Sequence, residues 1–398
     1  MRPRLLRTLV FAAAVLASWP LHAWQEPAGV DLKTLIGNLA SLDYITRTHA
    51  ARLVRRADAA AAVPALAEAV RRHPDEFVRH RAFVLLTAFN DRGTPALVGE
   101  LLRDRNDRLR EASYKWLEDH PEPRLTDTLL AALQSEQAEF VRPALIGALA
   151  ALDDSTPVQR ALVAEATRGL DLFREAVIES LGRQRAAYAA ATIADISKLD
   201  GPLRTSAMLA LGRIGGPTAQ AALKELAIAS GDDVQTLRAA MCLAGEGCEE
   251  ALKALTQVAG SATPAAAMRA AMAALSAMGI GPAAAAAGKP AAGVSPADAA
   301  TAAIVSLGAR GGAVRDQAAI AFSAIALRRP DSIVAWLDAS PESVRTAAVD
   351  LMKEGFERLE EDYAEEQFYA AARAAYWKGA DGSATRTMAA ALIQRLEF

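Results

Sequence analysis

The sequence has few of the residues that most often carry chemistry. Its 398 residues include two cysteines and five histidines. No histidine is followed by an acidic residue, and the motifs HExxH, GxSxG and SxxK are absent, which excludes the common signatures of zinc hydrolases and serine nucleophiles. His73 and His80 are close in sequence, but no third ligand accompanies them. We therefore expect no metal site, no catalytic residues and no cofactor.

A strong charge of one sign and a large aromatic content are also missing. The formal net charge is −3, with acids and bases interleaved, which argues against nucleic acid as a partner. Aromatic residues make up 5% of the chain, whereas 52% is apolar and rich in alanine and leucine, a composition that favours helices. Because 398 residues exceed the size of one hydrophobic core, the chain contains either several domains or a repeat array.

The first 23 residues have the pattern of a signal peptide. Three arginines precede the apolar stretch LVFAAAVLA at 9–17, and a helix-breaking proline precedes the expected cleavage position, Ala23. Cleavage after Ala17 is the alternative, and an uncleaved anchor is less favoured because nine apolar residues are too short to span a bilayer. The uncharged stretch at 270–288 is mostly alanine and glycine, so we expect no membrane span after cleavage. The chain is expected to be an exported, periplasmic protein of a bacterium.

An arginine at the start of an apolar, helix-like stretch returns at a nearly constant interval. The phrase DEFVRHRAFVLL is followed by DRLREASYKWL, EFVRPALIGAL and DLFREAVIESLG, and successive arginines are 32, 31, 32, 32, 30, 34, 31, 46 and 30 residues apart. A fixed period of this size indicates a solenoid of stacked repeats. The ten arginines are Arg47, Arg79, Arg110, Arg142, Arg174, Arg204, Arg238, Arg269, Arg315 and Arg345.

Each period also contains a second apolar helix, for example over 63–72 and 94–104, with apolar residues at three- and four-residue steps. A unit of about 31 residues therefore holds two helices of ordinary length and two short turns. Prolines are expected at the start of second helices, where the missing N–H is tolerated: Pro64, Pro95, Pro157 and Pro217. The expected core includes Leu85, Leu86, Leu145, Leu149, Ile178, Leu181, Leu209, Leu211 and Ile320.

The repeated pattern resembles HEAT repeats, especially the short HEAT-like repeats also found in phycobilisome lyases. It consists of an acidic or turn residue, an apolar residue with arginine, an alanine about three positions later and a Leu-Gly end, as in DLFREAVIESLG, over about 32–378. The resemblance implies an all-α, right-handed α-solenoid of about ten helical hairpins, a HEAT/armadillo-like superhelix. It also implies that each arginine pairs with an acid of a neighbouring repeat and fastens the stack. A ligand-binding role for single arginines is the alternative, and the acids before Arg269 and Arg315 are missing.

One interval, of 46 residues, coincides with an Ala/Gly/Pro-rich tract whose composition favours a flexible loop. The expected organisation is a signal peptide at 1–23, repeats 1–8 at 24–278, the loop at 279–296, repeats 9 and 10 at 297–378, and a C-terminal capping helix at 379–398.

The two cysteines, Cys242 and Cys248, lie six positions apart, a spacing that excludes a CxxC redox motif. In an exported chain such a pair suggests a disulfide that would pin the end of one helix to the start of the next. The alternative is two buried thiols, since the geometry of a helix end can hold the Cβ atoms apart.

The C-terminal part differs in composition. Residues 354–366 contain seven acids and one base, and aromatic residues recur over 356–377. We expect these aromatics to seal the exposed end of the solenoid while the acids face water. The alternative is contact with a partner through exposed aromatics, with Tyr369, Tyr376 and Trp377 as candidates.

The function expected from these features is a non-enzymatic scaffold that binds a protein or peptide through the concave surface of the solenoid. The alternative, which rests on the resemblance, is an enzyme similar to phycobilisome lyases that attaches or removes a tetrapyrrole. Fold alone does not fix function, and export would separate the chain from the cytosolic substrates of such lyases.

Overall fold

The computed structural model describes residues 31–152, 155–226, 233–281, 294–359 and 361–398, and within these ranges all regular structure is helical. The expected signal peptide at 1–23 and most of the expected loop at 279–296 lie outside the described residues. The chain is an α-solenoid of helical hairpins, as the repeat period predicted.

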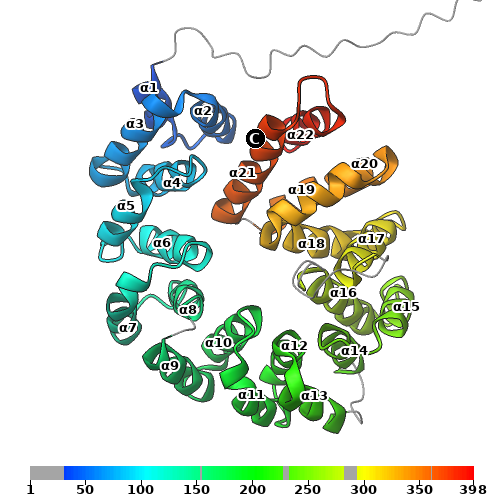
Figure 1. The fold of residues 1–398 in the computed structure, drawn as a ribbon. Helices are drawn as coiled ribbons and strands as arrows, with labels where there is room; N and C mark the ends of the chain where they lie inside the picture. Colours follow the sequence, from blue (N-terminus) through cyan, green and yellow to red (C-terminus); the bar gives the residue numbers. More distant parts are fainter. Residues whose placement is uncertain (1–30, 153–154, 227–232, 282–293, 360) are drawn as a thin grey trace, which may run out of the picture.

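Ten helices carry the periodic arginines, and we call them the arginine helices. In Figure 1 the first members line the inner side of the curve, from α4 to α12. Consecutive arginine helices contact each other along the stack. Their bounds are α2 (Tyr44–Arg56), α4 (Glu76–Thr87), α6 (Asp107–Asp119), α8 (Arg142–Ala150), α10 (Asp171–Arg183), α12 (Leu203–Ile214), α14 (Asp233–Leu243), α16 (Ala265–Gly279), α18 (Gly312–Arg328) and α20 (Glu342–Leu359).

A second helix follows each arginine helix and completes the hairpin; α5, α7, α9, α11 and α13 lie on the outside of the curve in Figure 1. The chain begins with α1 (Leu32–Asn38) and ends with the capping helix α22 (Ala384–Arg395). The second helices are α3 (Ala59–Arg72), α5 (Thr94–Leu101), α7 (Thr126–Ser135), α9 (Thr156–Thr167), α11 (Ala190–Ser197), α13 (Gly216–Glu225), α15 (Cys248–Ala259), α17 (Pro296–Gly308), α19 (Pro330–Ala339) and α21 (Asp362–Lys378). The short 3-10 helices η2 (Pro123–Leu125) and η3 (Ala187–Ala189) precede α7 and α11.

Proline marks the start of most second helices, but not of α3. Pro95, Pro157 and Pro217 lie in the first turns of α5, α9 and α13. The expectation for Pro64 was wrong, because α3 already begins at Ala59, where the Asp58 carboxylate accepts from a first-turn N–H, so this proline lies inside the helix. The N-cap at Asp58 thus starts α3 before the position that the proline alone indicates.

The core follows the predicted pattern with two exceptions. Of the expected core residues, Leu209 and Ile320 are only partly buried, and the others are buried. Each of the two lies on an arginine helix beside buried residues, at the edge of the buried face. Because these helices pack on neighbours on two sides, the apolar pattern alone does not show where the buried face ends.

The long interval falls inside a hairpin. The segment 282–293, outside the described residues, connects α16 to α17, and these two helices pack against each other. The boundary that we expected at 297 between repeats 8 and 9 therefore separates the two helices of one pair.

The two ends of the solenoid meet. Helix α21 contacts α4 of the second hairpin and also α18 and α19, so the curve closes into a ring (Figure 1). Two hydrophobic clusters run through the stack, and Tyr363 of α21 belongs to the N-terminal one while Ala88, which follows α4, belongs to the C-terminal one. The ring is therefore closed by apolar packing as well as by polar contacts.

Candidate functional site

The guanidinium of Arg79 lies between two repeats. Its Nε donates to the carbonyl oxygen of Val70 in the last turn of α3 at 2.7 Å, and its terminal nitrogens donate to the carboxylate of Asp104, which precedes α6. The last carbonyls of a helix have no partner within that helix. Arg79 therefore caps one helix while its charge pairs with an acid of the next repeat.

Arg110 repeats this arrangement with the most regular geometry. Its Nε and Nη2 donate to the two oxygens of Glu136 at 2.8 Å each, and its Nη1 donates to the carbonyl oxygen of Asp104 at 2.8 Å. The hydrogen bonds from Arg110 lower the pKa of the Glu136 carboxyl. This two-pronged pairing is the strong form of an arginine–carboxylate contact.

Similar contacts recur along the row in weaker form. Arg142 donates to the carbonyl oxygen of Glu136 at 3.2 Å and lies 3.8 Å from the carboxylate of Glu165. Arg174 donates to the carbonyl oxygen of Ala166 at 3.1 Å and pairs with an acid of its own helix. The row thus joins adjacent repeats through backbone carbonyls even where the interrepeat ion pair is long or missing.

The sequence lacks the expected acids before Arg269 and Arg315. In the structure, Arg315 makes contacts between repeats, and Arg269 makes none among the described residues. Arg315 donates to the carbonyl oxygen of Gly308 at 3.2 Å and to both oxygens of Glu354 on the next arginine helix. Arg269 and Arg345 make no such contact with any residue that the structure describes. The remaining members contact Ser41 (Arg47), Asp233 (Arg204) and Gln235 (Arg238).

Contacts between residues far apart in the sequence close the ring. Nε of Arg55 on α2 donates to Oε2 of Glu366 on α21 at 2.9 Å, and the hydroxyl of Tyr363 donates to Oδ2 of Asp119 on α6 at 2.9 Å. Glu366 is 1% exposed. Burial raises the pKa of its carboxyl, and the Arg55 guanidinium opposes that rise.

The acidic C-terminal stretch lies against the first repeats. A cavity of about 760 Å³ separates Arg81 and Arg108, on α4 and α6, from Asp362 and Glu365 at the start of α21. We expected these acids to face water, but Glu366 is buried and Glu365 is partly buried. The expectation was wrong for Glu366, because α21 packs on the first repeats and buries that side chain, whereas Glu357 and Asp362 are exposed.

Several groups where α21 contacts the first repeats have shifted pKa values. Burial, together with repulsion from Asp362, raises the pKa of Glu365 to about 7. Burial lowers the pKa of His80 to about 4, and it raises the pKa of Asp119 despite the hydrogen bond from Tyr363. Burial therefore makes these groups costly to ionise where the two ends of the solenoid meet.

Burial removes two of the three candidate partner contacts from the surface. Tyr369 is 1% exposed and packs against Phe398, and Tyr376 is 5% exposed. Trp377 remains 59% exposed beside Tyr376. A surface role for Tyr369 and Tyr376 is thus contradicted, since Tyr369 packs between Arg55 and Phe398 and Tyr376 packs against Arg386 of α22.

A second cavity, of about 660 Å³ and open to solvent, is lined by the C-terminal ends of the arginine helices α6, α10, α12, α16 and α18 and by α21. This volume is within the range of ligand-binding sites. Small residues of α21, including Ala370, Ala371 and Ala374, form one wall. We call this space the central cavity.

Four arginines line the central cavity: Arg183, Arg185, Arg213 and Arg328. Nε of Arg183 donates to Glu118 at 3.0 Å. Nε of Arg213 is buried and has no hydrogen-bond partner among the described residues. Burial lowers the pKa of Arg213, the Glu179 carboxylate opposes this, and the charges of Arg183 and Arg328 add to the lowering.

Sequence reasoning missed this cluster, although a signal for part of it exists. Arg183 and Arg213 each follow a Leu-Gly pair, in ESLGR and LALGR, nine positions after the periodic arginine of their repeat. The same register places both side chains at the same end of neighbouring helices. Arg328 comes from the opposite side of the ring, and no periodicity connects it to the other two.

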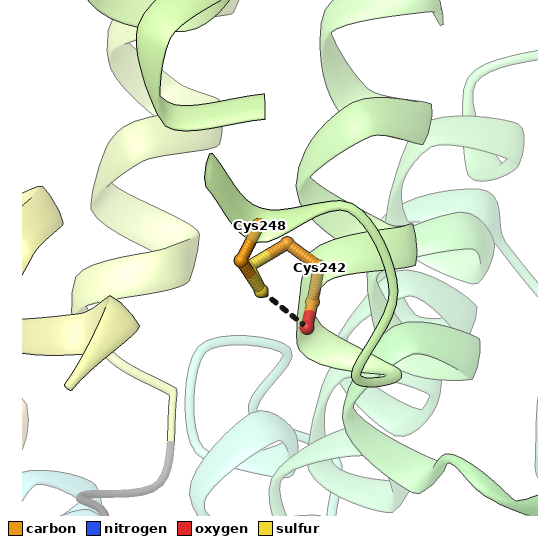
Figure 2. The surroundings of a disulfide bond; sticks show 2 residues. All are labelled: Cys242 and Cys248. Atoms are coloured by element: carbon orange, nitrogen blue, oxygen red, sulfur yellow. Dashed lines mark hydrogen bonds between the residues drawn. A yellow bond between two sulfur atoms is a disulfide. The ribbon is translucent and has the colours of Figure 1, made fainter. Parts of the chain in front are cut away.

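Cys242 and Cys248 are joined by a disulfide in the structure, with their Cα atoms 4.4 Å apart (Figure 2). Cys242 lies in the last turn of α14, and Cys248 is the first residue of α15. The chain between them turns through Gly245 and Gly247, both of which have positive φ. Glycine tolerates this backbone without steric cost, so the turn brings the two helix ends together.

Large apolar side chains are exposed along the edge where the arginine helices begin. Phe77, Phe140 and Leu172 are examples, from α4, the turn before α8, and α10. This edge lies at the end of the helices opposite to the central cavity.

No cluster of three or more potential metal ligands occurs among the residues searched, which are those that the structure describes. Over the same residues, no helix is both long and apolar enough to cross a membrane.

Comparison with known proteins shows solenoids of low similarity. No family model and no curated protein matches the sequence. The complex of CpcE and CpcF of phycocyanin lyase from Nostoc sp. PCC7120 is 20% identical over 64% of this chain and 96% of that chain, with a TM-score of 0.35. Importin beta is 14% identical over 92% of this chain and 55% of that chain, with a TM-score of 0.35. Kap121p bound to Ste12p is 15% identical over 92% of this chain and 45% of that chain, with a TM-score of 0.38.

These scores are too low to carry an argument, so the assignment rests on the chain itself. Its hairpins stack with the predicted period, and its periodic arginines lie between consecutive repeats. The chain is an α-solenoid of stacked helical hairpins, and its repeated pattern resembles that of HEAT repeats.

Proposed function

We propose that this chain is an exported, non-enzymatic scaffold that binds a segment of a protein or peptide in the central cavity. The single observation that carries the proposal is the cavity itself, about 660 Å³ between the inner helices and α21. Solenoids commonly bind partners on the inner helices, and here α21 narrows that surface to a bounded space.

Export is supported by the arginine-rich and apolar pattern of residues 1–23 and by the disulfide between Cys242 and Cys248. Disulfides persist in oxidising compartments such as the periplasm. Fractionation of expressing cells, with sequencing of the mature N-terminus, tests this part. Full-length chain in the cytoplasm would contradict it.

Site-specific crosslinking tests where the partner binds. Ala374 is exposed and lines the cavity, whereas Ala131 is exposed on the outer helix α7. A photo-crosslinking amino acid at position 374 should capture a defined partner in the envelope, and the same amino acid at position 131 should not. Capture from Phe77 or Leu172 alone would place the partner on the exposed apolar edge and contradict the cavity.

A non-enzymatic role is tested by the purified protein. A bound tetrapyrrole would give visible absorbance, and turnover of a tetrapyrrole adduct would contradict the scaffold. We expect neither.

A further inference from the structure

The central cavity carries positive charge that the described residues do not neutralise. Arg183 pairs with Glu118, but Arg185, Arg213 and Arg328 have no ion-pair or hydrogen-bond partner among the residues that the structure describes. Arg185 and Arg328 are exposed, whereas Nε of Arg213 is buried, and a buried donor without a partner is unfavourable. A ligand that accepts a hydrogen bond from Arg213 would remove that cost, and its negative charge would also attract the two exposed arginines.

Among the nearby acids, Glu118 pairs with Arg183, while Asp119 interacts electrostatically with Arg328 and Glu179 of α10 with Arg213. The Asp119 carboxylate accepts from the hydroxyl of Tyr363, and Glu361 lies 3.9 Å from Lys115. Asp331 lies in the first turn of α19, where an acid stabilises the helix start. The cavity lining therefore carries a small excess of positive charge, which favours an anion as ligand.

Two lining residues follow helix ends in a left-handed backbone conformation. Arg185 follows α10 with φ of 53°, in the left-handed region that usually selects glycine at a helix end. Asn90, which follows α4 and also lines the cavity, has φ of 50°. This left-handed turn ends α10, where the N–H of Ala186 donates to the carbonyl oxygen of Leu181, and it places Arg185 at the cavity wall.

We propose that the central cavity binds an acidic peptide segment, whose carboxylates lie against Arg185, Arg213 and Arg328 while its backbone runs along the alanine-lined wall of α21. This inference rests on the proposed function and names the chemistry of its partner. The cavity volume accommodates a few residues, and the alanines leave room for the main chain. Guanidinium groups bind carboxylates in two-pronged, charge-assisted pairs.

Binding of fluorescent hexaglutamate to the purified full chain is the test, with hexalysine and hexaserine as matched peptides. We expect only hexaglutamate to bind, with an affinity that falls as salt rises. Arg213→Gln and Arg328→Gln should each weaken binding by at least about tenfold, the effect of losing one charge-assisted hydrogen bond. Arg103→Gln, at an exposed arginine beyond α5, should leave binding unchanged.

Thermal unfolding without peptide separates recognition from a structural role. Because burial and the charges of Arg183 and Arg328 disfavour the Arg213 cation while only Glu179 favours it, Arg213→Gln should leave the Tm unchanged or raise it. A lower Tm with unchanged hexaglutamate affinity would make Arg213 a structural brace and overturn the inference. Equal binding of hexaserine, or competition by inorganic phosphate as effective as by hexaglutamate, would also overturn it.

The two proposals fail in different ways. If position 374 captures a partner but hexaglutamate does not bind, the acidic chemistry is wrong and the scaffold stands. If hexaglutamate binds through Arg213 while position 374 captures no protein, the acidic chemistry is supported and the scaffold role is contradicted.

Discussion

Nε of Arg55 lies 2.9 Å from Oε2 of Glu366, although 311 positions separate the two residues in the sequence. The first residue is on α2, in the first hairpin, and the second is on α21, in the last. Their contact turns an open solenoid into a ring, so each end is covered by the other. In an open solenoid the terminal repeats need a polar outer face, whereas here each terminal repeat is covered by the other where they touch.

Breaking this pair should open the ring. Arg55→Ala leaves the Glu366 carboxylate buried without its partner, which costs about 3 kcal/mol of unfolding free energy. Denaturant unfolding measures the loss, and small-angle scattering should show a larger radius of gyration. Arg72→Ala is the control, because Arg72 and Glu68 are exposed and their pair contributes less than about 1 kcal/mol. Unchanged scattering for Arg55→Ala would show that other contacts hold the ring closed.

The periodic arginines should differ in their contribution according to their partners. Arg110→Ala should cost about 3 kcal/mol because Glu136 is nearly buried, and Arg142→Ala and Arg174→Ala about 1 kcal/mol each. Arg269→Ala, at the same position of its repeat, should have no measurable effect. Hydrogen exchange should quicken around the substituted repeat and much less near Arg345. Equal losses at Arg110 and Arg269 would contradict the fastener role.

The Leu-Gly ends of the repeats should resist substitution. A Cβ on Gly212 of α12 would lie 2.5 Å from the carbonyl oxygen of Ala240 on α14, so Gly212→Ala should destabilise the chain by about 1–3 kcal/mol. Gly99 of α5 has open space, and Gly99→Ala should stabilise by about 0.5–1 kcal/mol through helix propensity. Thermal unfolding of the two variants should therefore shift in opposite directions.

Glu365 should make stability depend on pH. Its pKa rises from 4.5 to about 7 in the folded chain, so the folded state holds this proton more tightly than the unfolded state does. Its stabilising contribution is present below about pH 4.5 and is lost as the pH rises through about 7, by at most about 3 kcal/mol. Glu365→Gln should flatten the dependence of unfolding free energy on pH in this window and stabilise the chain at pH 8. An unchanged profile would contradict the shift.

The disulfide should stabilise the α14–α15 turn. It closes a loop of seven residues, for which chain entropy gives about 2 kcal/mol. Reductant should lower the Tm of the wild type and leave a Cys242→Ser, Cys248→Ser variant unaffected. Mass spectrometry after alkylation without reductant should find no free thiol, and two alkylated cysteines would contradict the bridge.

The amino-acid sequence by itself determined the repeat. The spacing of Arg47 to Arg345, the apolar steps and the prolines predicted helical hairpins of the observed length, because these signals act within one helix or between adjacent helices. Most of the core followed from the same local pattern. The arginine row was also visible, although the exact acid that each arginine pairs with depends on turns whose geometry the sequence does not specify.

Only the tertiary structure decided how the ends meet and what they enclose. Small rotations between repeats add up along the chain, and their sum determines whether the solenoid stays open or closes. That sum places Glu366 on Arg55, buries Tyr369 and brings Arg328 across the ring toward Arg183 and Arg213. No periodicity in the sequence predicts these contacts, because each depends on the summed curvature of many hairpins and not on any single hairpin.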